Sequence, residues 1–156
     1  MSSIMIIDFT DDAWTQASLP FCSGGLGIQK AVDIALLCYI SSALSAHSVV
    51  EDILSSVTDL ASFEMSAEIE TWKASGPGLI EPNGEACFRQ KAWDTPHIDF
   101  IQGTLLENAD QFSRARLLAS AQPESGAWAS AIPVPNLGTQ LSPAELRITF
   151  ALRIGP

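Results

Sequence analysis

Apolar residues recur at helical spacing over residues 28–44, and this is the longest such pattern in the chain. Its main face comprises Ala31, Ile34, Ala35, Cys38 and Ser42, and Leu37, Ile40 and Leu44 widen it. Residues three and four apart share one side of a helix, so a face this wide predicts a helix at the centre of a core. The pattern recurs over residues 49–60 and 62–74, each about one globular helix long.

Cap and turn residues predict where the first helix begins and ends. Thr10 stands where an N-cap belongs, ahead of an apolar segment that contains Trp14. This helix must end before Pro20, because the residue that precedes a proline is pushed out of the α region. The three glycines at positions 24, 25 and 27 then predict a compact turn.

Further helices are expected in the second half of the chain. A short helix is expected over 86–93, and Thr95 and Pro96 resemble an N-cap and a first helical residue that open another over 97–107. The next helix carries an apolar stripe of Phe112, Ala115, Leu118 and Ala121. A short helix follows over 125–131, and Ser142, Pro143 and Glu145 form a capping box that begins the last one.

These segments predict an all-α fold, an irregular bundle of about seven to nine short helices. Three glycines and two prolines between residues 75 and 84 predict one strong break. The break separates an acidic N-terminal helical half, 1–74, from a C-terminal helical half, 85–156. With 156 residues, 47% of them hydrophobic and 17% charged, the chain is about one domain, and we expect the halves to pack as one unit.

Charge is distributed unevenly along the chain. The formal net charge is −10; residues 1–72 contribute −9 (ten acids, one base) and residues 73–156 contribute −1 (eight acids, seven bases). Nucleic acids bind mainly through Lys and Arg, so only the second half is a candidate surface, and its candidate contacts are Arg89, Lys91, Arg114 and Arg116. The sequence shows no bilayer-spanning run and no basic segment before an apolar leader, so we expect an intracellular protein, in cytoplasm or nucleus, without membrane contact. A mean hydropathy of +0.20 also predicts self-association.

No catalytic, cofactor-binding or metal-binding residue is expected. Residues 9–12, Phe-Thr-Asp-Asp, resemble the paired palm aspartates of reverse transcriptases, but only eight residues precede them, so a helix cap explains them better. The three cysteines form no Cys-x2-Cys pair, and His47 and His97 are fifty positions apart, which is unlike a zinc site. The glycine turn lacks the Lys-Ser/Thr of a phosphate-binding loop.

Several short motifs occur in one order along nearly the whole chain. The first is Trp14, Gln16-Ala17, Leu19-Pro20 and the glycine cluster 24–27, followed by an apolar helix. The later ones are Gln90–Asp94, Arg114–Ala119, Ser125–Trp128 with Pro133, and the capped helix that ends in Leu-Arg-Ile-Gly at 152–155. Together they resemble the thumb and linker that follow the polymerase core in reverse transcriptases of non-LTR retrotransposons, the class with a restriction-like endonuclease.

The resemblance implies a non-catalytic helical segment of a larger polymerase, with the thumb in residues 1–74 and the linker in 85–156. In such a parent its partners are the adjacent palm domain and the template–primer. It covers neither the palm nor the zinc knuckle and nuclease that follow in the family, so neither active site is carried over and no enzyme activity is expected. Two alternatives remain open. In the first, the chain is an acidic helical module that binds other proteins. In the second, it binds RNA or DNA weakly through the four basic residues named above.

Overall fold

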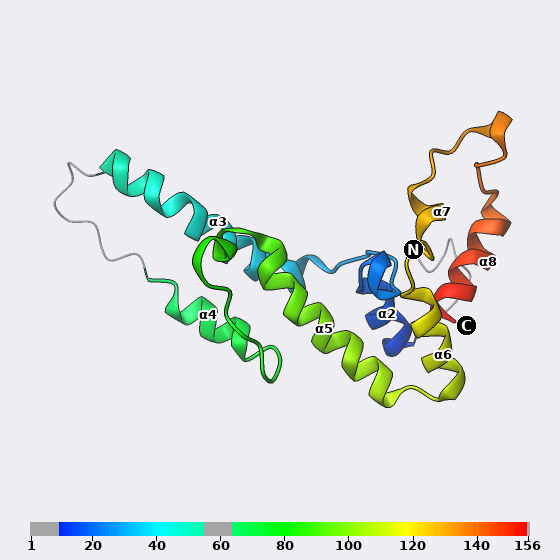
Figure 1. The fold of residues 1–156 in the computed structure, drawn as a ribbon, viewed down its shortest axis with the longest axis horizontal. Helices are drawn as coiled ribbons and strands as arrows, with labels where there is room; N and C mark the ends of the chain where they lie inside the picture. Colours follow the sequence, from blue (N-terminus) through cyan, green and yellow to red (C-terminus); the bar gives the residue numbers. More distant parts are fainter. Residues whose placement is uncertain (1–9, 55–63, 156) are drawn as a thin grey trace. The chain divides into compact units, whose positions relative to one another are not determined.

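The computed structural model describes residues 10–54 and 64–155, and their fold is shown in Figure 1. Within these residues the chain forms helices and no strand. The α-helices are α2 (Asp11–Ser18), α3 (Ala31–Leu54), α4 (Ser66–Lys73), α5 (Gln90–Asn108), α6 (Gln111–Ser120), α7 (Ala127–Ser130) and α8 (Pro143–Ile154). The 3₁₀ turns are η1 (Phe21–Ser23), η2 (Gly84–Phe88) and η3 (Pro135–Leu137). Of these described residues 70% are helical, which confirms the all-α prediction. Within the described ranges no helix is both long enough and apolar enough to cross a bilayer.

The chain divides into two compact units. Unit 1 comprises Met1–Gln29 and Ile101–Pro156, and unit 2 comprises Lys30–Phe100. These units differ from the halves 1–74 and 85–156 that the charge and the Gly/Pro-rich break suggest. The difference arises because α2 and η1 pack against α8 and α6, far along the chain. Contacts between distant segments leave no trace in a local sequence pattern.

Unit 2 has a core built around two tryptophans. In it α3 packs against α4 and η2, and the buried residues are Leu37, Ile40, Met65, Trp72 and Trp93. The two indole rings meet edge to face, with centroids 5.0 Å apart. Trp93 Nε1 donates a hydrogen bond to the Cys87 carbonyl oxygen at 2.8 Å. Trp72 Nε1 is buried and has no acceptor among the described residues.

The predicted break lies inside unit 2 as a loop between α4 and η2. Lys73, at the end of α4, joins the helix to this loop by ion pairs with Glu70 at 3.0 Å and Glu81 at 3.1 Å. A Cβ on Gly76 would meet the Phe100 ring at 2.9 Å, so the loop backbone packs closely on the side chain of α5. The Gly/Pro-rich segment therefore connects two packed helices and does not separate domains.

Two expectations for unit 2 are wrong. Residues 49–54, expected in a separate helix, continue α3, and the rest of that predicted segment lies outside the described residues. The buried side of α3 is that of Leu37, Ile40 and Ser41, whereas Ala31 and Ala35 are exposed. Many residues of α3 are apolar, so its periodicity alone does not single out the side that α4 covers.

The predicted helix start at Thr95 is also wrong. Residues 90–108 form one helix, α5, with Pro96 inside it. Thr95 does not cap; its Oγ1 donates to the Lys91 carbonyl oxygen, one turn back, at 2.8 Å. Proline in a helix interior removes one backbone hydrogen bond but does not forbid the helix. Trp93, three residues before Pro96, is buried in the core of unit 2 against Trp72 of α4, so tertiary packing holds this part of α5 in place.

The predicted helix caps of unit 1 are confirmed. Thr10 Oγ1 accepts a hydrogen bond from the Ala13 amide at 3.2 Å, and α2 ends before Pro20. Ser142 Oγ accepts from the Glu145 amide at 3.3 Å, and Glu145 Oε2 accepts from the Ser142 amide at 2.7 Å. This reciprocal pair is a complete capping box. Local hydrogen bonds thus fix the first residue of both α2 and α8.

The core of unit 1 joins the two ends of its sequence. Its buried residues are Ala13, Ala17, Leu26 and Ile154, with Phe21, Ile28 and Phe150 packed around them. In α6 the predicted apolar stripe is wrong, because Phe112 is 87% exposed whereas Leu117 is 3% exposed. A Cβ on Gly24 would meet Leu117 Cδ1 at 2.8 Å, so the glycine turn provides the surface on which Leu117 packs.

Candidate functional site

The polar centre of unit 1 is the side chain of Gln16, which is 4% exposed. Its Nε2 donates to the carbonyl oxygens of Gly24 at 3.1 Å and Arg153 at 2.9 Å. Its Oε1 accepts from Arg116 Nη2 at 3.2 Å. Both ends of the amide are therefore used, as buried polar groups require. One side chain of α2 thus links the glycine turn, α6 and α8.

Arg153, on α8, is the second member of this centre and is 5% exposed. Its guanidinium donates to three carbonyl oxygens, those of Gly25 through Nε at 2.7 Å, Ser125 through Nη1 at 3.2 Å, and Phe21 through Nη2. It also lies over the Phe21 ring, 5.1 Å from the centroid. Burial lowers the pKa of Arg153 from its usual value. The described residues bring no carboxylate to this cation, and backbone dipoles and an aromatic face solvate it instead.

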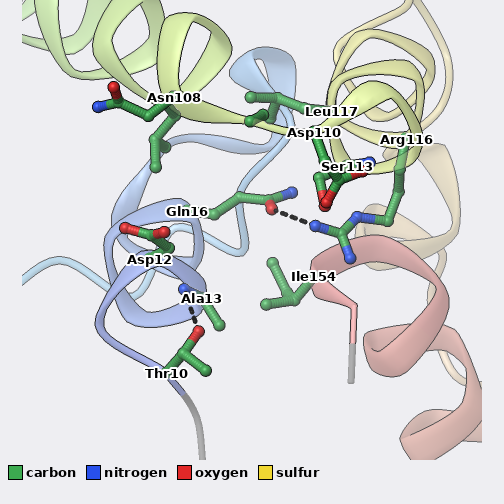
Figure 2. Close-up of a pocket in the computed structure, with 12 residues that line it drawn as sticks. Thr10, Asp12, Ala13, Gln16, Asn108, Asp110, Ser113, Arg116, Leu117 and Ile154 are labelled. Carbon is green, nitrogen blue, oxygen red and sulfur yellow. Dashed lines mark hydrogen bonds between the residues drawn. The ribbon is translucent and has the colours of Figure 1, made fainter.

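Arg116 is the third member, and Figure 2 shows it reaching from α6 towards Gln16. Its Nε is buried and has no acceptor among the described residues. Burial lowers the pKa of Arg116, and the negative charge of Asp110 partly opposes this effect. We call Gln16, Arg116 and Arg153, together with the carbonyls of Phe21, Gly24, Gly25 and Ser125, the polar hub.

Two glycines allow the backbone to come close enough to form the polar hub. A Cβ on Gly25 would overlap the Leu19 carbonyl oxygen, which is backbone and cannot rotate away. Gly155 has a φ of +90°, and a Cβ there would overlap the Arg116 guanidinium. Glycine is required at position 25 because a side chain there would push backbone segments apart, whereas at position 155 it is the positive φ that favours glycine.

A cavity of about 310 Å³ opens beside the polar hub. Figure 2 shows its lining, with Asp12, Asp110 and Arg116 as the charged groups. Asp110 is the N-cap of α6 and accepts hydrogen bonds from the Ser113 amide, the Ser113 hydroxyl and the Phe112 amide. These bonds, that of the Ser113 amide foremost, lower the pKa of Asp110. The polar groups of the cavity are thus largely engaged in holding helices.

The histidines stand in arrangements unlike a hydrolase site. His97 Nδ1 lies 3.5 Å from Ser75 Oγ, but that hydroxyl donates to the Trp72 carbonyl oxygen at 2.6 Å. A serine nucleophile must give its proton to the base, and here the shorter contact of the hydroxyl is with the backbone carbonyl. His47 pairs with Glu51, one turn along α3, at 3.3 Å.

The acidic pair at the start of α2 and the cysteines have structural settings. Asp11 and Asp12 are exposed in the first turn of α2, where their negative charges stabilise the helix by interacting with the positive end of its dipole. Phe9 lies outside the described residues. All three cysteines are free thiols, and Cys22 is exposed. In the part of the chain that the structure describes, no three His, Cys, Asp or Glu side chains gather as a metal site.

The four predicted nucleic-acid contacts do not come from one compact unit. Arg89 and Lys91 are exposed in unit 2, where η2 meets α5. Arg114 and Arg116 belong to unit 1 and lie two positions apart on α6, so they point to different sides of the helix. Arg114 is exposed, and its Nη1 lies 3.4 Å from the Leu106 carbonyl oxygen. Arg116 is held in the polar hub, which leaves Arg114 as the accessible cation of this pair.

Sequence reasoning from charge and motif chemistry missed the importance of Gln16 and Arg153. The ordered motifs carried a signal, because five of them supply atoms to the polar hub or to its closest contacts. These are Gln16-Ala17, the glycine cluster 24–27, Arg114–Ala119, Ser125–Trp128 and Leu152–Gly155. Each motif is too short to point to the others. No family model, curated protein or solved structure matches this chain.

Proposed function

We propose that this chain is a non-catalytic structural segment of a retrotransposon-type reverse transcriptase, equivalent to the thumb and linker that follow the polymerase core. The single observation that carries the proposal is the convergence of the resemblance motifs that lie in unit 1; Gln90–Asp94 belongs to unit 2 and takes no part in it. Residues up to 137 positions apart meet in the polar hub, where their polar atoms bond to one another. Buried glutamine and arginine side chains that bond mainly to backbone hold segments in place and offer no group for chemistry.

Support also comes from the type of residue involved. Gln16 uses its amide on both sides, Arg153 bonds carbonyls of three segments, and Gly25 permits the close approach. These residues hold the segments of unit 1 in position, which is a structural role and not a catalytic one. A segment that supports a neighbouring polymerase domain needs a rigid shape and no active site, and this matches what the resemblance implies.

The experiment uses the chain in trans with a polymerase core of this retrotransposon class that ends at its palm. Primer extension on an RNA template, with Mg²⁺ and deoxynucleotides, is followed by the length of the products. The chain alone is expected to incorporate no nucleotide, and its addition to the core is expected to lengthen the products. Unchanged product length together with no binding of the chain to the core contradicts the proposal. So does metal-dependent incorporation by the chain alone that Asp11→Asn with Asp12→Asn abolishes.

A matched pair of variants shows whether the hub carries the effect. Gln16→Ala removes the central amide, whereas Gln111→Ala removes an exposed glutamine at the start of α6. The first should lose the stimulation and the second should keep it. A second, independent observation is the DNA that flanks the coding sequence. Absence of palm and nuclease remnants in every frame would count against this origin.

Unit 2 favours a second candidate function, an acidic module that binds other proteins. The second half of α3 exposes Val49, Val50 and Ile53 beside Glu51 and Asp52. Apolar contacts flanked by acids suit a basic partner that also offers apolar side chains. Pull-down with the wild-type chain and with Glu51→Gln/Asp52→Asn tests this. Partners that bind only the wild type support the module, and equal recovery by both chains contradicts it.

A further inference from the structure

Unit 2 exposes the residue pair Asn83–Gly84 where the loop after α4 meets η2. Of the three asparagines in the chain, Asn83 is the one that glycine follows, since Asn108 precedes alanine and Asn136 precedes leucine. A side chain on the following residue shields its backbone nitrogen, whereas glycine leaves that nitrogen open to approach. At this pair an asparagine side chain therefore meets the next backbone amide with the least hindrance.

The Asn83 side chain and the Gly84 amide make no hydrogen bond within residues 10–54 and 64–155. The side chain of Asn83 does not cap η2, and the Gly84 amide donates to no acceptor there. Gly84 has a φ of +57°, and a Cβ at this position would meet nothing within 4 Å, so the space around the pair is open. Both groups can change conformation without losing a contact of their own.

We propose that Asn83 and Gly84 are a site of spontaneous deamidation, at which the chain modifies itself with water as the one co-reactant. The Gly84 backbone nitrogen attacks Cγ of Asn83, and a succinimide ring closes as the Cγ–Nδ2 bond breaks. The attacking nitrogen gives up its proton to the departing Nδ2, so ammonia leaves. Water then opens the ring: addition at Cγ yields aspartate, and addition at the backbone carbonyl carbon yields isoaspartate, whose main chain runs through Cγ.

The fold makes this reaction a local event. The Asn83 backbone is extended, with a ψ of 163°. Attack requires the nitrogen and Cγ to approach to about 3–3.5 Å, and rotation about the Asn83 Cα–C bond supplies that approach. The rotation releases one hydrogen bond, from the Ala86 amide to the Asn83 carbonyl oxygen, whose length of 3.3 Å is beyond the usual range. Neither residue belongs to the buried core of unit 2, so the reaction does not require the unit to unfold.

The isoaspartate product acts on η2. It adds a carbon atom to the main chain between positions 83 and 84, so the carbonyl oxygen of residue 83 no longer lies where the Ala86 amide reaches it. η2 packs against α3, and the Cys87 carbonyl oxygen within it accepts the hydrogen bond of Trp93 Nε1. Displacement of the first turn of η2 therefore loosens a contact of the unit 2 core. The aspartate product keeps the normal main chain and changes only the charge.

Ageing of the purified full chain in neutral buffer tests the proposal. Trypsin releases Asn83 in peptide 74–89 and Asn136 in peptide 117–147, each as the only asparagine of its peptide. Mass spectrometry measures the fraction in which OH has replaced NH2, and fragment ions assign the change to the asparagine. Asn136 is the internal control, because it is exposed and also lies at a 3₁₀ turn. Asn83 should be lost at least about tenfold faster than Asn136.

Two glycine variants separate the effect of the neighbouring residue from that of the loop. Gly84→Ala places a methyl group beside the attacking nitrogen and should slow the loss of Asn83 at least about tenfold. Gly78→Ala is the matched control, because Gly78 lies in the same loop, has a φ of +77° and likewise has open space around it. It brings the same kind of backbone strain and should leave the rate unchanged. Circular dichroism checks that both variants fold, and the comparison of Asn83 with Asn136 in the wild type needs neither variant.

Hydrogen–deuterium exchange measures the effect on η2. The deamidated chain, separated from unreacted chain by ion exchange, should exchange the amides of 84–89 several-fold faster than the fresh chain, and Asn83→Asp should not. These results together support the proposal. Loss of Asn83 as slow as that of Asn136 overturns it, as does equal slowing by Gly78→Ala and Gly84→Ala. Unchanged exchange in the deamidated chain also overturns it, because no product then displaces η2.

Discussion

Replacement of Arg153 by methionine is the sharpest test of the polar hub. Methionine keeps much of the apolar length of the side chain but cannot donate a hydrogen bond. Three carbonyl oxygens lose a donor, and the contact with the Phe21 ring loses its charge. The Phe21 carbonyl keeps the Gly24 amide at 3.1 Å as a donor. The carbonyls of Gly25 and Ser125 have no second donor in the described residues.

The expected cost follows from these two carbonyls. A buried polar group without a partner costs about 1–3 kcal/mol, which applies in full to the buried Gly25 carbonyl and in part to the half-buried Ser125 carbonyl. The lost cation–π contact adds to this cost, and relief from burying a charge subtracts from it. We expect Arg153→Met to lower the free energy of unfolding by about 3 kcal/mol. This is a large part of the roughly 5–15 kcal/mol of a typical protein.

The measurement is urea unfolding followed by circular dichroism, with Arg114→Met as the matched control. Arg114 is exposed and makes one long contact with the Leu106 carbonyl oxygen, so its replacement should change the free energy by less than about 0.5 kcal/mol. If Arg153→Met proves as stable as Arg114→Met, the hub does not hold unit 1 together and the reasoning fails.

Three more outcomes are expected. Hydrogen bonds from Ser113, that of its amide foremost, lower the pKa of Asp110 in the folded state. The ionised carboxylate therefore stabilises the fold at pH values above its unfolded pKa, and this stabilisation is lost as the pH falls. In urea titrations the stability difference between the wild type and Asp110→Asn should shrink below about pH 4. Gly25→Ala should destabilise by at least about 3 kcal/mol by thermal melts, whereas Gly103→Ala, in a helix with open space around it, should stabilise by about 1 kcal/mol; equal effects would contradict the packing argument. If unit 1 binds RNA at all, Arg114→Ala should reduce the salt slope of hairpin binding by about 1, and binding that does not depend on salt would dispose of the electrostatic contact.

Features that depend on neighbouring residues could be predicted from the sequence. The cap at Thr10 and the capping box at Ser142 need only residues three positions away, and the structure contains both. The glycine turn is of the same kind, since Gly24 with a φ of +88° follows a local steric rule. The helical class follows from periodicity for the same reason.

Features set by distant partners could not be predicted. The continuity of α5 through Pro96 and the burial of Leu117 in place of Phe112 depend on which segment lies opposite. In the candidate site, the sequence suggests that Arg116 is an exposed cation, because its partner Gln16 lies 100 positions away along the chain. The sequence gives the charge of each side chain, but the burial of that side chain depends on which distant segments surround it in the folded protein.

The distance along the chain between Arg153 and its acceptors has a consequence for synthesis. The carbonyls of Phe21 and Gly25 leave the ribosome 132 and 128 residues before the guanidinium that binds them. Helix α2 can form early, but the side of it that packs against α8 stays exposed until α8 has emerged from the ribosome. During that interval the nascent segment exposes apolar side chains to chaperones and to neighbouring chains. Unit 1 therefore completes its fold only after the last helix of unit 1 has been translated.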